Sequence, residues 1–198
     1  MDLQHKKQNV YGASINQTRF GSYSVLDHSS LRLDKSVQAS AECQKTSAFV
    51  LPTPHGDVFS AAWPGPNSCG LTMSTLANGT LDKVTSAWQY ANESGVHGLA
   101  SNSDYTLLYS ADLNGNSIWT HSISRDSTQA PRLLNRYRVV GADRHPRHLV
   151  AHPSGKYLHV LMEGSNQLAE FLLDERNGLP IKETAMHSLI PRGKKNSS

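Results

Sequence analysis

Short runs of alternating apolar and polar residues, each closed by a polar turn, follow one another along the whole chain. The turns are rich in Asn-Gly and Ser-Gly pairs, as at Asn78-Gly79 and Ser154-Gly155, which favour tight hairpins. No segment longer than about ten residues has the 3.6-residue period of an amphipathic helix. The strand-like runs cover residues 9–15, 20–26, 48–51, 70–74, 96–101, 107–111, 117–123, 148–152, 157–162 and 167–172. Many short strands at regular spacing predict an all-β fold.

Two of these stretches repeat one another at a distance of 50 residues. Leu108 matches Leu158 and Asn116 matches Asn166, each 50 residues further on. A period of about 40 to 50 residues with strands and turns inside it is typical of a β-propeller blade. The repeat predicts blades at about residues 143–188, 95–142 and 43–94, and part of another at 9–39. The proline-containing stretch 56–68 is predicted to be an irregular loop.

This pattern amounts to about three and a half four-stranded blades. Closed propellers have roughly four to eight blades, so the chain alone does not complete a ring. We therefore expect a partial β-propeller, truncated at both ends, that forms one domain over residues 1–191. The polar end of the chain, residues 192–198, is expected to be a disordered tail.

Composition narrows the possible partners and compartments. The chain has 198 residues, a net charge of +3 and two cysteines, Cys43 and Cys69. The charge is too small and too scattered for a nucleic-acid surface, and no apolar run is long enough to cross a membrane. The first residues lack the apolar core of a signal peptide. We expect a cytoplasmic protein with no disulfide framework, no nucleic-acid or membrane partner and an undetermined oligomeric state.

Three residues stand out as candidates for chemistry. His97 and Arg147 lie 50 residues apart, at equivalent places in successive repeats. A hairpin centred on Gly155 would place Glu163 directly opposite Arg147. Arg can bind a carboxylate with two parallel hydrogen bonds, and a partly desolvated Glu can hold a proton for delivery. The plainer interpretation is a surface ion pair, of about 0–1 kcal/mol, next to a histidine at a strand edge.

Motifs for cofactors and metals are missing from the sequence. It has no glycine-rich phosphate loop and no G-x-S-x-G elbow. The histidines are not spaced like zinc ligands, and the segment His145-Pro146-Arg147-His148 lacks a Cys or carboxylate companion. We therefore expect neither a cofactor nor a metal.

The segments Val96-His97-Gly98-Leu99, His145-Pro146-Arg147 and Leu161-Met162-Glu163 resemble the lactonase-type propeller family. That family includes the fungal carboxy-cis,cis-muconate cyclases and 6-phosphogluconolactonase. The resemblance implies a seven-bladed propeller with His97, Arg147 and Glu163 as catalytic residues. It also implies a second arginine from a later blade, for which this chain has no counterpart. The implied reaction closes 3-carboxy-cis,cis-muconate, a tricarboxylate, to carboxymuconolactone in aromatic catabolism (the β-ketoadipate pathway), without cofactor or metal.

The chemistry of these residue types suits that reaction. Arg147 would stabilise the negative charge that builds up on a carboxylate, and His97 would bind or protonate another. Either Glu163 or His97 would deliver the proton to carbon. Two alternatives stay open: a lactone hydrolase of the 6-phosphogluconolactonase type, and a non-catalytic propeller fragment. Truncation is expected to impair or abolish activity of the chain as given.

Overall fold

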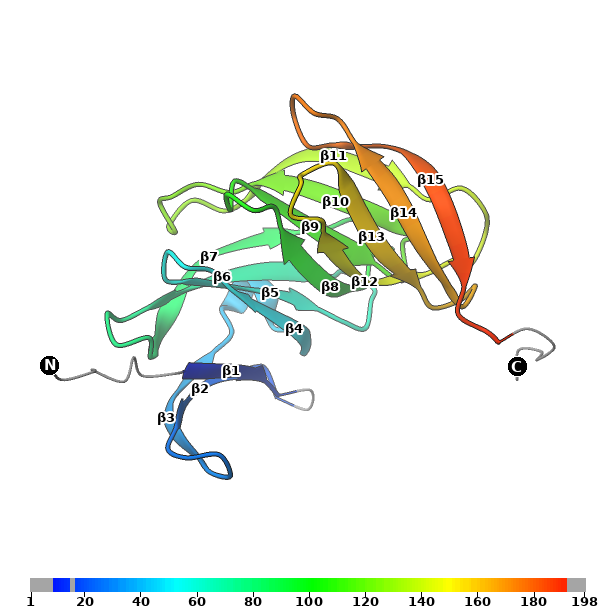
Figure 1. Cartoon of the computed structure of the whole chain (residues 1–198). Helices are drawn as coiled ribbons and strands as arrows, with labels where there is room; N and C mark the ends of the chain where they lie inside the picture. Colours follow the sequence, from blue (N-terminus) through cyan, green and yellow to red (C-terminus); the bar gives the residue numbers. More distant parts are fainter. Residues whose placement is uncertain (1–8, 15–16, 192–198) are drawn as a thin grey trace, which may run out of the picture.

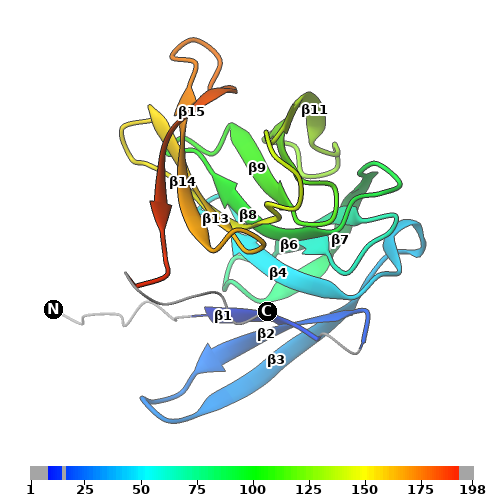
Figure 2. The ribbon, with the colours of Figure 1, turned by 90° about the vertical axis from the view of Figure 1, so that its right-hand side faces the viewer.

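The protein is built almost entirely of antiparallel β-sheet, as the sequence predicts. The computed structural model describes residues 9–14 and 17–191; the predicted tail at 192–198 lies outside them. Fifteen strands form four separate sheets, which follow one another in a row like the blades of a propeller (Figure 1). The view at right angles shows the first sheet below the other three (Figure 2). No helix among the described residues could cross a membrane.

Each sheet corresponds to one of the predicted blades. Blade 1 contains β1 (Asn9–Ala13), β2 (Arg19–Val25) and β3 (Leu31–Gln38). A short 3-10 helix (Ala41–Cys43) leads into blade 2, with β4 (Ser47–Pro52), β5 (Asp57–Ala62), β6 (Cys69–Thr75) and β7 (Leu81–Gln89). Blade 3 contains β8 (Val96–Ser101), β9 (Leu107–Asp112), β10 (Ser117–Ser122) and β11 (Arg132–Arg138). Blade 4 contains β12 (Pro146–Ala151), β13 (Tyr157–Met162), β14 (Gln167–Leu173) and β15 (Pro180–Ser188).

The first strand of blades 2, 3 and 4 packs against its neighbours, β4 against β8 and β8 against β12. Blade 1 differs, because β1 takes the place of a second strand. Tyr11 of β1 donates its hydroxyl to the Gly79 carbonyl of the next blade, at 2.7 Å. Tyr109 of β9 makes the same bond to the Gly178 carbonyl, at 2.8 Å. The described part of blade 1 therefore begins at the second strand position.

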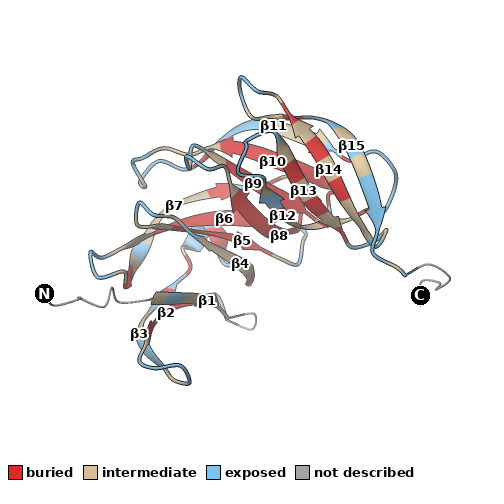
Figure 3. Cartoon of the chain, in the orientation of Figure 1, coloured by how far each residue is buried: buried red, intermediate tan, exposed pale blue. Residues whose placement is uncertain are grey.

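The sequence patterns underpredict the strands. Strands β3 and β11 are polar and β5 lies inside the stretch 56–68 that was expected to be a loop. That expectation is wrong for Asp57–Ala62, a strand whose residues from Val58 onward are buried. Small residues such as Ser60 and Ala61 contribute little to the hydrophobic pattern of the sequence. They nevertheless suit a strand that is packed between two blades. The outer strands β3 and β15 face solvent, so they lack an apolar run (Figure 3).

The core lies between successive blades rather than at one centre. Between blades 3 and 4, Ile118, Val160 and Phe171 are fully buried in one cluster. On β13 the buried residues alternate with more exposed ones, as expected for a strand with one covered face. Burial of these faces in a stack holds each blade in a fixed orientation to the next, and this fixes the relative positions of residues on adjacent first strands.

Cys43 and Cys69 form a disulfide, so the expectation that they stay unpaired is wrong. Both are buried, their Cα atoms lie 5.7 Å apart, and they join the 3-10 helix to strand β6. Two cysteines separated by 26 residues carry no pattern that reveals this pairing. The bond fixes the segment that connects blade 1 to blade 2.

Replacing both cysteines by serine should lower the free energy of unfolding by about 3 kcal/mol, because a cross-link over this span removes loop-closure entropy from the unfolded chain. Urea denaturation of oxidised protein, reduced protein and the double variant measures the effect. Reduction should destabilise the original protein and leave the double variant unchanged. Equal stability of all three samples would contradict a structural disulfide.

Candidate active site

A β-bulge at the same place in three blades positions the candidate residues. Where the first strand pairs with the second, the ladder skips one residue of the first strand. The skipped residues are Ala48 in blade 2, His97 in blade 3 and Arg147 in blade 4. A bulged residue leaves the hydrogen-bonded ladder and its side chain is redirected, a feature often found beside active sites. The structure thus confirms that His97 and Arg147 occupy equivalent places.

Arg147 and Glu163 are neighbours, although not by the predicted register. The ladder of blade 4 pairs Pro146 with Met162 and His148 with Leu161, so Arg147 has no partner strand residue. Glu163 comes directly after the last pair. Its Oε2 atom lies 2.9 Å from Nε of Arg147, and the two side chains are 50% and 43% exposed, respectively. The ion pair therefore exists, but its carboxylate is half in solvent rather than desolvated.

His97 lies on strand β8 of the neighbouring blade and is 8% exposed. Its Nε2 atom accepts a hydrogen bond from Nε of Arg147 at 3.3 Å, so the proton of the neutral ring sits on Nδ1. Burial is the largest of the causes that lower the pKa of His97, followed by the charges of Arg147 and His148; Glu163 opposes them. His97 is thus a neutral imidazole near pH 7, and its one acceptor nitrogen is already bonded to Arg147.

Arg147 keeps most of its hydrogen-bonding capacity free. Its Nε–H donates to His97, Glu163 forms an ion pair at the same nitrogen, and neither Nη group makes a hydrogen bond to another described residue. The end of the guanidinium is the fork that matches a carboxylate with two parallel hydrogen bonds. The arrangement can therefore receive an anionic ligand without breaking the existing contacts.

Buried polar contacts fix the backbone on both sides of the site. In blade 4, Glu163 and Gly164 donate their N–H groups to the carbonyls of His145 and Arg144, at 2.9 and 3.0 Å. The Arg144 side chain is itself buried and pairs with Glu183 at 2.5 Å. Arg147 and Glu163 are thus held by the same short segment, which limits their relative movement.

In blade 3 the fully buried Asp112 fixes the backbone beside the site. Its carboxylate accepts from the Ser94 hydroxyl at 2.6 Å, the Gly95 N–H at 2.9 Å and the Trp119 indole at 2.9 Å. These bonds fix the chain at the entry to β8, two residues before His97. The Gly115 N–H is a fourth donor, at 2.8 Å, and a charged group with four donors can be buried at acceptable cost.

Gly98 allows blades 3 and 4 to approach closely enough for His97 to meet Arg147. A Cβ atom at Gly98 would lie 2.5 Å from the Arg147 carbonyl oxygen and 3.1 Å from the His148 Cα. Without a side chain at this point, the rings of Phe49 in blade 2 and His148 in blade 4 come within 5.7 Å of each other. The glycine is therefore a packing requirement of the site.

Two further aromatic residues belong to the site, and the sequence patterns did not reveal them. His148 lies edge-to-face against His97, with ring centroids 4.9 Å apart. Trp63 contacts His97 in a similar geometry, at 5.3 Å. Both rings are brought to His97 by the stacking of the blades. Trp63 could have been found only from its position, because it directly follows the second strand of blade 2 as Glu163 follows that of blade 4.

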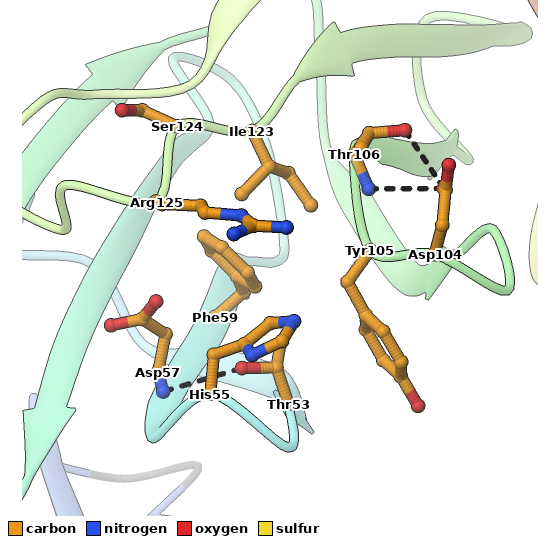
Figure 4. A pocket seen from close by; sticks show the side chains of 10 residues that line it. All are labelled: Thr53, His55, Asp57, Phe59, Asp104, Tyr105, Thr106, Ile123, Ser124 and Arg125. Atoms are coloured by element: carbon orange, nitrogen blue, oxygen red, sulfur yellow. Dashed lines mark hydrogen bonds between the residues drawn. The ribbon is translucent and has the colours of Figure 1, made fainter.

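A small hollow lies on the opposite rim, where the first two strands of blades 2 and 3 turn (Figure 4). It encloses a cavity of only about 30 Å³, enough for one or two water molecules. Its lining includes Asp57 and Asp104 as well as Arg125. Two carboxylates and little space make it unsuitable for a multiply charged anion.

Gly98→Ala should lower the free energy of unfolding by about 1–3 kcal/mol, because the new methyl group overlaps the Arg147 carbonyl. Gly12→Ala is the matched control, since its Cβ would lie 3.7 Å from the nearest atom, in Tyr23. That change should leave stability unchanged or raise it by about 0.5 kcal/mol. Chemical denaturation of both variants tests this, and equal stabilities would show that Gly98 has no packing role.

Known proteins share this sequence and architecture. A sequence profile of the family "Lactonase, 7-bladed beta-propeller" matches residues 2–198. Carboxy-cis,cis-muconate cyclase of Neurospora crassa is 27% identical over 202 residues, which cover 98% of this chain and 54% of that protein. Muconate cycloisomerase 1 of Cutaneotrichosporon cutaneum is 31% identical over 110 residues, covering 54% of this chain and 27% of that protein. The chain spans about half the length, or less, of these curated relatives.

Solved structures agree on the fold. A putative 6-phosphogluconolactonase from Bacteroides uniformis superposes with a TM-score of 0.74 at 19% identity, covering 93% of this chain and 55% of that one. The periplasmic gluconolactonase PpgL of Pseudomonas aeruginosa gives 0.76 at 18% identity, covering 98% and 57%. Together with the profile match over nearly all residues, these findings show that the chain belongs to the seven-bladed β-propeller lactonase family.

Proposed function

We propose that this chain carries part of the active site of a cycloisomerase that closes 3-carboxy-cis,cis-muconate to carboxymuconolactone. The observation that supports the proposal is that neither Nη group of Arg147 hydrogen-bonds another described residue, while its Nε–H donates to His97 and Glu163 forms an ion pair with it. The similarity to the Neurospora crassa cyclase, over 98% of this chain, supports the choice of substrate. The proposed substrate is a small tricarboxylate.

The reaction needs no oxidant or reductant. An oxygen of one substrate carboxylate forms a bond to a carbon of the conjugated double bond, and the displaced electron pair moves onto a second carboxylate. A proton then adds to the neighbouring carbon, which gives the lactone. Charge thus builds up on the second carboxylate in the transition state, and a guanidinium already in position stabilises it without reorganisation.

Proton delivery falls to Glu163 or His97. Burial and nearby positive charge keep His97 neutral near pH 7, with its proton on Nδ1. Glu163 is half exposed and is the better placed of the two to pass a proton to carbon. The single acceptor nitrogen of His97 already bonds Arg147, so His97 would serve to orient the guanidinium.

Hydrolysis of a lactone is the second candidate function. Two of the similar structures are named as a gluconolactonase and a putative 6-phosphogluconolactonase. The exposure of Glu163 would let this carboxylate activate a water molecule. The two functions differ in product, since hydrolysis releases acid from a lactone and cyclisation consumes the diene.

Arg147→Ala should reduce kcat/KM for 3-carboxy-cis,cis-muconate by roughly 10²–10³-fold, as expected when one donor to a developing charge is lost (about 3–4 kcal/mol). Loss of the diene absorbance measures the rate, in the chain as given and in the polypeptide with any flanking sequence that its gene encodes. Arg132→Ala, which removes an exposed arginine on the outer strand β11, should leave the rate unchanged.

The assay also separates the candidates. Acid release from a lactone without diene consumption would favour the hydrolase. If folded protein with its flanking sequence consumed neither compound, the enzymatic proposal would be wrong. A less than tenfold effect of Arg147→Ala on a measurable rate would remove Arg147 from the mechanism.

A further inference from the structure

Trp63 occupies the same position in blade 2 as Glu163 does in blade 4. In blade 2 the last ladder pair joins Ser47 to Ala62, and Trp63 comes next. In blade 4 the last pair joins Pro146 to Met162, followed by Glu163. Trp63 is half-buried, and its ring lies 5.3 Å from that of His97 at an angle of 63°. His97 therefore has Arg147 on one side and an indole on another.

The backbone places Trp63 firmly at this point. Its N–H donates to the Thr46 carbonyl at 3.2 Å, and the Thr46 hydroxyl donates to the Trp63 carbonyl at 3.1 Å. The buried Ser68 hydroxyl links the Ala62 carbonyl, at 2.6 Å, to the Val96 N–H, at 3.2 Å. The loop that carries Trp63 is thus bonded to the strand that carries His97.

The site consequently has two chemically different halves. Arg147 and Glu163 provide charge and hydrogen bonds. Beyond His97 and His148 the described neighbours are Trp63 and Phe49, which provide aromatic surface. A ligand whose carboxylate binds Arg147 could extend past His97 toward this aromatic half, where the rings would pack favourably on a flat, unsaturated group.

The geometry points to Trp63 as a specificity residue that selects planar, conjugated carboxylates over saturated ones of the same length. This inference rests on the proposed function only in taking Arg147 as the carboxylate anchor. It assigns to Trp63 a contact with the unsaturated part of the ligand, and no part in proton transfer.

Intrinsic fluorescence makes the contact measurable. The chain has three tryptophans, and Trp88 and Trp119 are only 8% and 6% exposed in the blade 2–blade 3 core. A ligand at the rim should therefore change the emission of Trp63 alone. Trp63→Phe should abolish the ligand-dependent signal, while Trp88→Phe should preserve it.

Affinity is tested by calorimetric titration with cis,cis-muconate and with adipate, its saturated six-carbon counterpart. The original protein should bind the conjugated diacid about tenfold more tightly. Trp63→Leu should bring the two affinities within about twofold of each other by weakening muconate alone, and Trp63→Phe should keep most of the preference. Arg147→Ala should weaken both diacids. Circular dichroism confirms that each variant is folded.

The outcomes separate this inference from the reaction proposed above. An unchanged preference in folded Trp63→Leu, a fluorescence response that persists in Trp63→Phe, or no binding of either diacid by the original protein would each overturn it. Trp63-dependent preference in a protein that fails to cyclise 3-carboxy-cis,cis-muconate would support the inference and reject only the proposed reaction.

Discussion

One extra residue in the first strand of each complete blade is the constraint from which the candidate site follows. Where the first strand pairs with the second, the ladder must skip a residue, and the skipped side chain is not committed to sheet packing. Blade stacking then sets the spacing between successive bulges. The same backbone feature presents an alanine, a histidine and an arginine at Ala48, His97 and Arg147, so chemistry is varied without changing the fold.

Close packing between blades converts these equivalent positions into one site. Gly98 removes the side chain that would separate β8 from β12, and Asp112 accepts hydrogen bonds from buried groups next to the bulge of blade 3. These hydrogen bonds offset the cost of burying its charge. Arg147 can then contact both His97 of the preceding sheet, at 3.3 Å, and Glu163 of its own, at 2.9 Å.

Much of this arrangement could be predicted from the 50-residue repeat in the sequence. It predicted the all-β fold, the blade boundaries, the equivalence of His97 with Arg147 and the proximity of Glu163, although the hairpin register is one residue off the predicted one and the bulge leaves Arg147 unpaired. The role of Trp63 could not be predicted from the repeat, because a contact between blades does not affect the alternation of apolar and polar residues along a strand. It also missed the Cys43–Cys69 bond and strand β5, where small residues fill a buried position.

The proposed role of Arg147 is to bind a substrate carboxylate with its two Nη groups, beside His97 and Glu163. The most direct test is a crystal structure determined from crystals soaked with carboxymuconolactone. A ligand carboxylate is expected within hydrogen-bonding distance of both Nη atoms, with the Arg147–Glu163 contact kept. Lactone bound at a different place under saturating conditions, with Arg147 paired only to Glu163 and His97, would contradict it.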